Sequence, residues 1–322
     1  MGEQRSIQAP KGRPPSGKSR AKVFLWARLP LLAIALGFAL AALCAEESTS
    51  PTTDEFLHVT RGVAWWRAPD TRLSWPHPPL GHIVTGAPAA LMHEGTPFEE
   101  IRGFREADMP KVSVLYFRDY SRARAQLRAG RWAMIALTLL MLVYLYEWTL
   151  RRYGMRLASF VTLLLAANPA VLAHATVVTT DVPVTLVTLF SLLQLHDYLL
   201  TRSPWRLAGL ALGIAGLVTA KLSGIAVALL LFLPGLVYAV RGIGRFTGLT
   251  RTRRAWLLGR DAALIMLVAL FAINAVYRFD DTGLTVAEIS EHPTPPGRML
   301  RHLNEETSPI LRALPDDVPI PL

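Results

Sequence analysis

The chain is poor in cysteine. Its single thiol, Cys44, excludes an intrachain disulfide and leaves the redox compartment open. The ligand spacings H-x-x-x-H and C-x-x-C are absent, so the sequence contains no tight metal motif. No obligatory metal or other cofactor is therefore predicted, with a divalent cation as the open alternative. An internal repeat is also lacking, which argues against transporters built from repeated halves.

Charge is scarce as well: charged residues make up 18% of the chain and hydrophobic residues 52%. The hydrophobic residues occur in blocks, and about 20 apolar residues in a helix cross the roughly 30 Å hydrocarbon core of a bilayer. The sequence predicts an all-α, polytopic integral membrane protein with about seven spans. Buried helices of a soluble protein are the alternative for any single block, but not for the whole set. The predicted spans are Val23–Ala45, Trp132–Leu150, Leu157–Thr176, Val182–Leu200, Trp205–Ala220, Leu222–Val240 and Ala262–Tyr277.

The few charges are unevenly placed, and their sign predicts the orientation. The formal net charge is +10, and the basic residues lie mainly between the apolar blocks, which favours membrane lipids over nucleic acid as the partner. Short loops with an excess of Lys and Arg stay in the cytoplasm. The tail 1–22 and the connectors Arg151–Arg156, Thr201–Arg206 and Arg241–Arg260 then all lie on the cytoplasmic side. A cleaved signal peptide in place of the first span is the alternative, and it also places Glu46 onward outside.

The chain divides into three parts on this interpretation. Residues 1–22 form a disordered basic tail, residues 23–278 form the transmembrane module, and residues 279–322 form a segment on the outer face. The outer loop 46–131 is too long to be a mere connector. Two of its stretches are predicted to form helices at the membrane interface: Leu80–Met92 and Arg118–Arg131.

This topology collects polar side chains at the outer face. Two of them lie at the ends of spans, where an ionisable group is costly and usually functional. Four more come from the outer loop. The six candidates are Asp54, Glu55, His58, His77, Asp181 and Lys221.

Most of these residues also have a purely structural explanation. Asp54 and Asp181 suit helix N-caps. His77 stands before two prolines and suits a turn into a helix. Lys221 suits a side chain that reaches toward lipid headgroups. The pair Trp65-Trp66 suits either an interfacial anchor or a platform for a sugar ring.

Several short motifs, taken in order, resemble those of the GT-C glycosyltransferases. The resemblance is strongest to the group of protein O-mannosyltransferases and lipid A aminoarabinose transferases, in its bacterial lipid-carrier-dependent members. It covers about residues 50–280. The motifs that carry it are Asp54-Glu55-x-x-His58-x-x-x-Gly62, Trp65-Trp66, His77-Pro78-Pro79-Leu80, Arg131, Asn168-Pro169 with Ala173-His174, Thr179-Thr180-Asp181-Val182-Pro183, Thr219-Ala220-Lys221-Leu222-Ser223-Gly224 and Tyr277-Arg278-Phe279.

The resemblance implies transfer of a sugar from a polyprenyl-phosphate donor to a protein, lipid or glycan acceptor. It also implies inversion at the anomeric carbon, on the periplasmic face of a bacterial inner membrane. A carboxylate acts as general base on the acceptor hydroxyl, and the matching residue is Asp54, with Glu55 supporting it or the local fold. Cations stabilise the leaving phosphate. The candidates for that role, in order of expectation, are Lys221, His77 and Arg131.

The other polar residues of the motifs are assigned to substrate contacts. Asp181 orients the acceptor, pairs with Lys221 or holds a cation. The full set of predicted donor or acceptor contacts is His58, His77, Arg131, Asp181, Lys221, Trp65 and Trp66.

Members of that group continue with further helices and often a C-terminal outer domain. The resemblance therefore implies a module that is truncated at its C-terminus or completed by another chain. Two alternatives to a working transferase remain open: a protein that binds or transports the lipid carrier without chemistry, and an incomplete transferase that serves as a scaffold. A transporter is expected to carry charges near the middle of several spans, whereas here they lie at the span ends.

Overall fold

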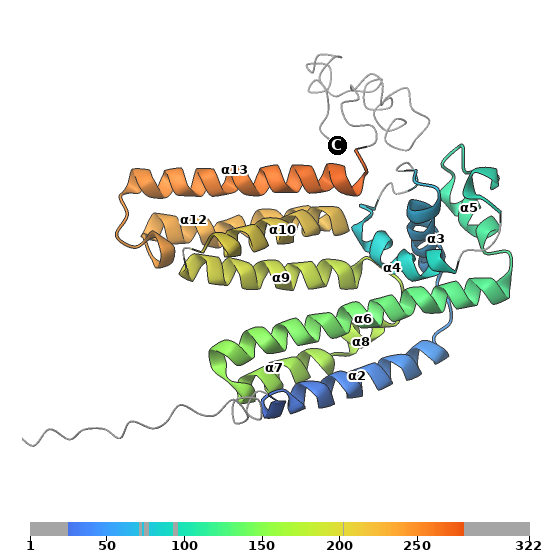
Figure 1. Cartoon of the computed structure of the whole chain (residues 1–322), viewed down its shortest axis with the longest axis horizontal. Coiled ribbons are helices and arrows are strands. Elements are labelled where there is room, and N and C mark those ends of the chain that lie inside the picture. Colours follow the sequence, from blue (N-terminus) through green and yellow to red (C-terminus); the bar gives the residue numbers. More distant parts are fainter. Residues whose placement is uncertain (1–24, 71–72, 74–76, 93–95, 202, 280–322) are drawn as a thin grey trace, which may run out of the picture.

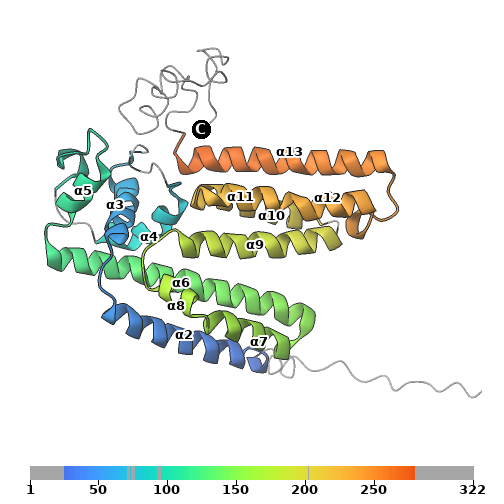
Figure 2. The same ribbon diagram turned by 180° about the vertical axis from the view of Figure 1, so that it is seen from behind.

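The computed structural model describes residues 25–70, 73, 77–92, 96–201 and 203–279. These residues form helices with short connections, and no strand occurs among them, which confirms the all-α prediction. The predicted tail 1–22 and residues 280–322 of the predicted outer segment lie outside the described residues. Long helices lie side by side, with a group of short helices at one end of them (Figures 1 and 2).

One group of long helices consists of α2 (Leu29–Ser48), α6 (Tyr120–Tyr153), α7 (Met155–Ala166) and α8 (Pro169–Ala175). α2 packs along α6, and both contact the α7–α8 pair (Figure 1). A small apolar core joins them: Phe38, Ala42, Ile135, Leu142 and Ala175. The opposite side of α2 exposes leucines, as a lipid-facing helix does.

A sharp bend separates α7 from α8, whose axes differ by 64°. Asn168 causes it together with Pro169, because proline has no N–H to continue the hydrogen-bond ladder of α7. The Asn168 side-chain oxygen accepts from the Ala170 N–H at 2.9 Å and so starts α8 as a new helix. The bend turns the chain toward the connection that leads into α9.

The second group contains α9 (Asp181–Leu200), α10 (Pro204–Ala220), α11 (Ser223–Leu230), α12 (Phe232–Arg241) and α13 (Arg251–Val276), with a short turn η3 (Gly244–Phe246). α10 lies between α9 and α13, and α11 and α12 follow each other along this layer (Figures 1 and 2). Leucine dominates the shared core, which also contains Tyr198, Ile214, Phe246 and Ile265.

Four short elements lie at one end of the long helices, here called the loop end (Figure 1). They are α3 (Thr53–Arg67), α4 (Leu80–Leu91), η2 (Phe98–Glu100) and α5 (Met109–Tyr116). One apolar core joins them to α6 and to the start of α9, through Met134, Val178 and Val182. The predicted interfacial helix Leu80–Met92 is thus α4, which packs against α3, α6, α9 and α10.

Among the described residues, five helical segments are long and apolar enough to cross a membrane, and the bent α7–α8 pair would make a sixth. They correspond to predicted spans and support an integral membrane protein. The predicted span Trp205–Ala220 coincides with α10, which has only 17 residues and falls below the length of the others. The remaining six are Leu29–Ser48, Arg122–Tyr153, Met155–Ala175, Asp181–Leu200, Ser223–Phe246 and Arg251–Val276.

Two predicted boundaries differ from those of the structure. The stretch Arg118–Arg131 does not form a separate interfacial helix, because α6 runs for 34 residues from Tyr120 and includes most of it. Arginine, alanine, leucine and glutamine all favour helix, so nothing in the sequence stops α6 before the span. α13 likewise begins at Arg251, eleven residues before the predicted Ala262, because the Thr250 hydroxyl caps it by accepting from the Arg253 N–H.

The end opposite the loop end holds the arginine-rich connectors and is here called the arginine end. Two buried carboxylates organise it. Asp197 of α9 pairs with Arg152 and Arg206, and Asp261 of α13 pairs with Arg245. These contacts tie α6, α9 and α10 together and join α13 to η3. Part of the arginine excess that predicted a cytoplasmic face therefore also joins helices.

A close crossing of α3 and α4 sets the position of the loop end. Gly62 of α3 and Gly86 of α4 meet backbone to backbone, and a Cβ built on Gly62 lies 2.6 Å from the Gly86 Cα. Real Cβ contacts do not reach that distance, and here backbone atoms stand in the way. Glycine is therefore required at this crossing, and it lets α4 bring His82 beneath His58 of α3.

Gly62→Ala is expected to lower the free energy of unfolding by about 1–3 kcal/mol, because two packed backbones must separate. Gly37→Ala is the matched control: it lies within α2 with nothing within 4 Å of a new Cβ. That control should be neutral or stabilise by up to about 1 kcal/mol. Denaturation of both variants in detergent measures the effect, and equal stability of the two would show that the crossing is looser than described.

Candidate functional site

A pocket opens at the loop end between α3, the connection that precedes α9, and the end of α10. Its volume is about 240 Å³, slightly below the roughly 300–1,000 Å³ of ordinary small-molecule sites. It therefore has room for one small polar group rather than a whole chain. The lining residues of this loop-end pocket are Asp54, Leu57, His58, Arg61, His77, Thr179, Thr180, Asp181 and Lys221.

One face of α3 supplies four of these residues, at positions 54, 57, 58 and 61. Residues spaced by three, four and seven lie on the same side of a helix. The register is set at the start of α3 by a capping box, in which Thr52 and Glu55 satisfy each other's backbone N–H groups. The N-cap is thus Thr52, so Asp54 is not the cap and its exposed carboxylate is left to face the pocket.

An ion pair between two helix ends forms the opposite wall. Lys221 Nζ donates to Asp181 Oδ1 at 2.6 Å, and both side chains are about one-third exposed. Asp181 begins α9 and Lys221 follows the last residue of α10. A carboxylate at a helix N-terminus and an ammonium at a C-terminus both complement the helix dipoles. Pairing with Lys221 was one of three predicted roles for Asp181, and it is the contact present here.

Three histidine rings lie close together beside α3. The rings of His58 and His82 lie 4.9 Å apart, and the ring of His77 lies 5.4 Å from that of His58. His58 Nδ1 and His82 Nε2 are 2.8 Å apart and share a hydrogen bond. His82 is buried behind His58 and does not line the pocket.

The histidines at this site are neutral at neutral pH. Burial, and then the nearby Arg61 charge, lower the pKa of His58 to about 3. The same two causes lower the pKa of His77 below its ordinary value. His77 was predicted as a cation for the leaving phosphate. His77 does line the pocket, and as a neutral imidazole it offers a hydrogen bond there.

The cations of the pocket are Lys221 and Arg61, and Arg61 was not predicted. Arg61 is buried, and its Nε donates to the Leu73 carbonyl at 3.0 Å, which holds the guanidinium in place. Burial lowers its pKa to about 10, against the opposing attraction of Asp54, so it stays charged at neutral pH. The signal for Arg61 was present in the sequence, since it lies seven residues after Asp54 on one helix face.

Glu55 and Arg131 lie outside the pocket and bind each other. Glu55 is fully buried, and both of its oxygens accept from the Arg131 guanidinium at 2.8 Å. Glu55 also accepts from the backbone N–H of Val178 at 3.0 Å. This geometry fits the supporting role considered for Glu55. Arg131 does not reach the pocket, so its predicted role beside the leaving phosphate needs correction.

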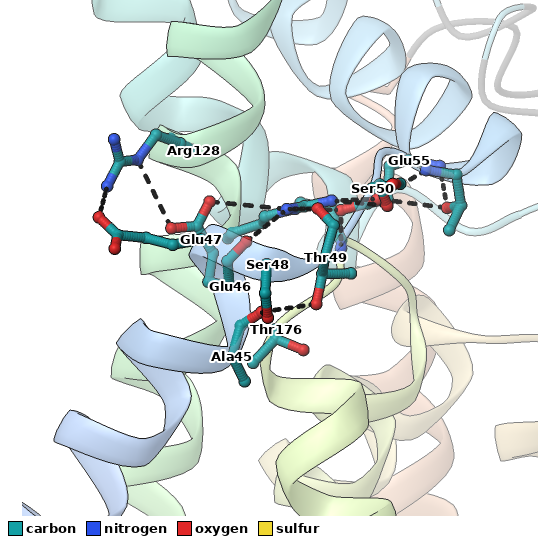
Figure 3. A network of polar contacts seen from close by, with 12 residues as sticks. Ala45, Glu46, Glu47, Ser48, Thr49, Ser50, Glu55, Arg128 and Thr176 are labelled. Carbon is teal, nitrogen blue, oxygen red and sulfur yellow. Dashed lines mark hydrogen bonds and ion pairs between the residues drawn. The ribbon is translucent and has the colours of Figure 1, made fainter.

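The same arginine holds the end of α2. Arg131 donates to the carbonyl oxygens of Glu46, Thr49 and Ser50 at 3.2, 2.9 and 3.3 Å. Glu46 is buried, with its Oε1 3.6 Å from Arg131 Nη1. Figure 3 shows Glu46, Thr49, Ser50 and Glu55 in this network. Four segments therefore meet at one charged group: the end of α2, the start of α3, α6, and the connection between α8 and α9. We call this arrangement the Glu55–Arg131 latch.

Trp65 and Trp66 also lie away from the pocket. The Trp65 indole N–H donates to the Val276 carbonyl at 3.1 Å, and Arg278 stacks over its ring at 4.3 Å. Trp66 is half exposed and donates to the Ile83 carbonyl at 2.9 Å. Trp65 thus joins α3 to the end of α13, and the predicted sugar-platform role does not fit its place in the structure.

The structure thus gathers five of the nine predicted site residues in one pocket: Asp54, His58, His77, Asp181 and Lys221. Within the described part of the chain, no three His, Cys, Asp or Glu side chains are arranged to hold a metal ion. Comparisons with protein-family models, curated proteins and solved structures found no match to this chain.

Proposed function

We propose that this protein is a membrane glycosyltransferase that moves a sugar from a polyprenyl-phosphate donor to an acceptor hydroxyl at the loop end. One observation supports this most: residues 54, 58, 77, 181 and 221, which come from four separate segments of the chain, line one pocket. The pocket combines a free carboxylate, two buried or paired cations and neutral imidazoles. Those are the groups needed to activate a hydroxyl and to hold a phosphate.

In the proposed reaction Asp54 accepts the proton of the acceptor hydroxyl. The acceptor oxygen forms a bond to the anomeric carbon, and the bond from that carbon to the donor phosphate oxygen breaks. The phosphate leaves with the electron pair, and Arg61 and Lys221 stabilise its charge. An acceptor oxygen that attacks opposite the leaving phosphate oxygen inverts the configuration at the anomeric carbon.

The membrane would position a polyprenyl-phosphate donor relative to the pocket. Its prenyl chain lies in the bilayer beside the long apolar helices, and its phosphate reaches the level of the helix ends. The loop end faces the periplasm in this proposal, with the arginine end in the cytoplasm. The acceptor, whether protein, lipid or glycan, approaches from the aqueous side.

A transfer assay tests the proposal. Purified protein in liposomes is incubated with a panel of polyprenyl phosphates that carry different radiolabelled sugars, together with mixed lipid and peptide acceptors. We expect label to pass to one acceptor class from one donor. Absence of transfer from every donor, while the donors still bind, would instead favour a carrier-binding protein.

Lys221→Gln is expected to weaken donor binding, because a phosphate loses one of two cations in the pocket. The KM for the donor should rise by about tenfold, a cost of roughly 1.4 kcal/mol. Lys111→Gln is the matched control, since Lys111 is exposed on α5 and lies outside the pocket. Equal KM values for both variants would show that the phosphate does not contact Lys221.

A further inference from the structure

His82 lies outside the pocket, yet it touches the pocket through His58. Its side chain is fully buried in α4, and its Nε2 is 2.8 Å from His58 Nδ1. The Gly62–Gly86 crossing holds α4 at this separation from α3. The two imidazoles therefore form a fixed pair, in which one nitrogen donates and the other accepts.

The second ring nitrogen of His82, Nδ1, indicates which imidazole donates in the hydrogen bond between His58 and His82. His82 Nδ1 is buried and has no hydrogen-bond partner within the described part of the chain. If His58 donated to His82, a neutral His82 would carry its proton on Nδ1, as a buried N–H without an acceptor. Orphaned buried N–H donors are rarer than unused acceptors. The arrangement therefore favours His82 Nε2–H as the donor and His58 Nδ1 as the acceptor.

This direction fixes the state of His58. A neutral imidazole that accepts at Nδ1 carries its proton on Nε2. His58 lines the pocket and has Nδ1 occupied by His82, so Nε2–H is the group it offers to a ligand. An N–H there suits an oxygen that gains negative charge during the reaction, such as a phosphate oxygen.

We propose that His82 is a positioning residue that keeps His58 in the Nε2–H tautomer, so that His58 donates a hydrogen bond to an oxyanion in the loop-end pocket. His82 does not touch the substrate. It determines which of the two imidazoles donates in their shared hydrogen bond. Without that bond His58 no longer presents an N–H to the pocket in every molecule.

Two variants at position 82 separate this role from packing. His82→Gln keeps an N–H donor near the position of Nε2, whereas His82→Met fills similar space without one. We expect His82→Met to lower kcat severalfold to about tenfold with little change in KM, because His58 loses both its single tautomer and the hydrogen bond that orients its ring. His82→Gln should recover most of that loss. Comparable unfolding midpoints of the two variants show that packing is not the cause.

The tautomer itself is measured by long-range ¹H–¹⁵N NMR of the full chain labelled at its 8 histidines. His58 signals are assigned by their loss in His58→Gln. The parent and His82→Gln should show Nε2–H at His58, and His82→Met should show a mixture of tautomers. A parent His58 protonated on Nδ1 would overturn the proposal, as would a kcat in His82→Gln as low as in His82→Met.

The transfer readout rests on the proposed function, whereas the NMR readout does not. If the parent transfers no sugar, the proposed function fails on its own. The His82 proposal is then tested by the tautomer and by titration of the NMR signals with polyprenyl phosphate. The His58 Nε2–H resonance should shift with this probe in the parent and less in His82→Met. No shift in the parent would overturn the proposed donation to an oxyanion.

Discussion

Asp54→Asn is expected to lower the rate of sugar transfer by about 10²–10⁴-fold, the usual contribution of a positioned general base. An amide has nearly the shape of a carboxylate but cannot accept the proton of an acceptor hydroxyl. Asp54 lies in the first turn of α3 and is exposed in the loop-end pocket, while Thr52 and Glu55 carry the helix cap. The variant should therefore fold normally and bind the donor, and single-turnover transfer in liposomes measures the loss.

Glu99→Gln is the control for that experiment. Glu99 is an exposed carboxylate of η2, outside the pocket, and the same change of charge there should leave the rate unchanged. If Asp54→Asn transferred sugar at a rate within a few-fold of the parent's, Asp54 would not be the general base. Asp181 would then be the next carboxylate to examine, since it is the other one in the pocket.

Arg131→Met is expected to lower the free energy of unfolding by about 3–5 kcal/mol, the cost of leaving a buried charge without its partner. Glu55 would remain fully buried with its strongest hydrogen-bond donor removed. The carbonyls at the end of α2 would also lose theirs. Denaturation in detergent with equal protein concentrations measures the difference from the parent.

Two further variants identify the cause. Arg131→Met combined with Glu55→Gln should be less destabilising than Arg131→Met alone. The amide keeps an acceptor for the N–H groups of Thr52 and Val178, and no unpaired buried carboxylate remains. Glu47→Gln removes an exposed partner of Arg128, 68% exposed at its side chain, and should cost about 1 kcal/mol or less. The double variant could instead lose as much free energy of unfolding as its two single changes added together. The latch would then act through packing rather than charge.

The pocket was largely predictable because its residues lie at helix ends. The ends of apolar blocks are visible in the sequence, and Asp181 and Lys221 stand at two of them. Once the spans alternate across a bilayer, those ends meet the outer loop that carries Asp54 and His77. Arg61 could have been added from its helical spacing to Asp54.

The latch could not be predicted, because nothing local in the sequence pairs Glu55 with Arg131. The two residues are 76 positions apart, and their contact depends on where α6 passes the start of α3. The start of α6 was itself misplaced. Arginines near Tyr120 suggested an interfacial segment, whereas the structure continues them into the span as one helix. Tertiary packing decides such cases, and periodicity alone does not.

The length of α6 bears on the height at which the chemistry would occur. Its 34 residues rise about 51 Å at 1.5 Å per residue, against a hydrocarbon layer of roughly 30 Å. If α6 lies along the bilayer normal, about 20 Å of it in total extends beyond the acyl chains at its two ends. Its loop-end part packs against α3 and α4. In the proposed reaction a hydrophilic acceptor would then approach the loop-end pocket without entering the bilayer, while the prenyl tail of the donor stays among the acyl chains.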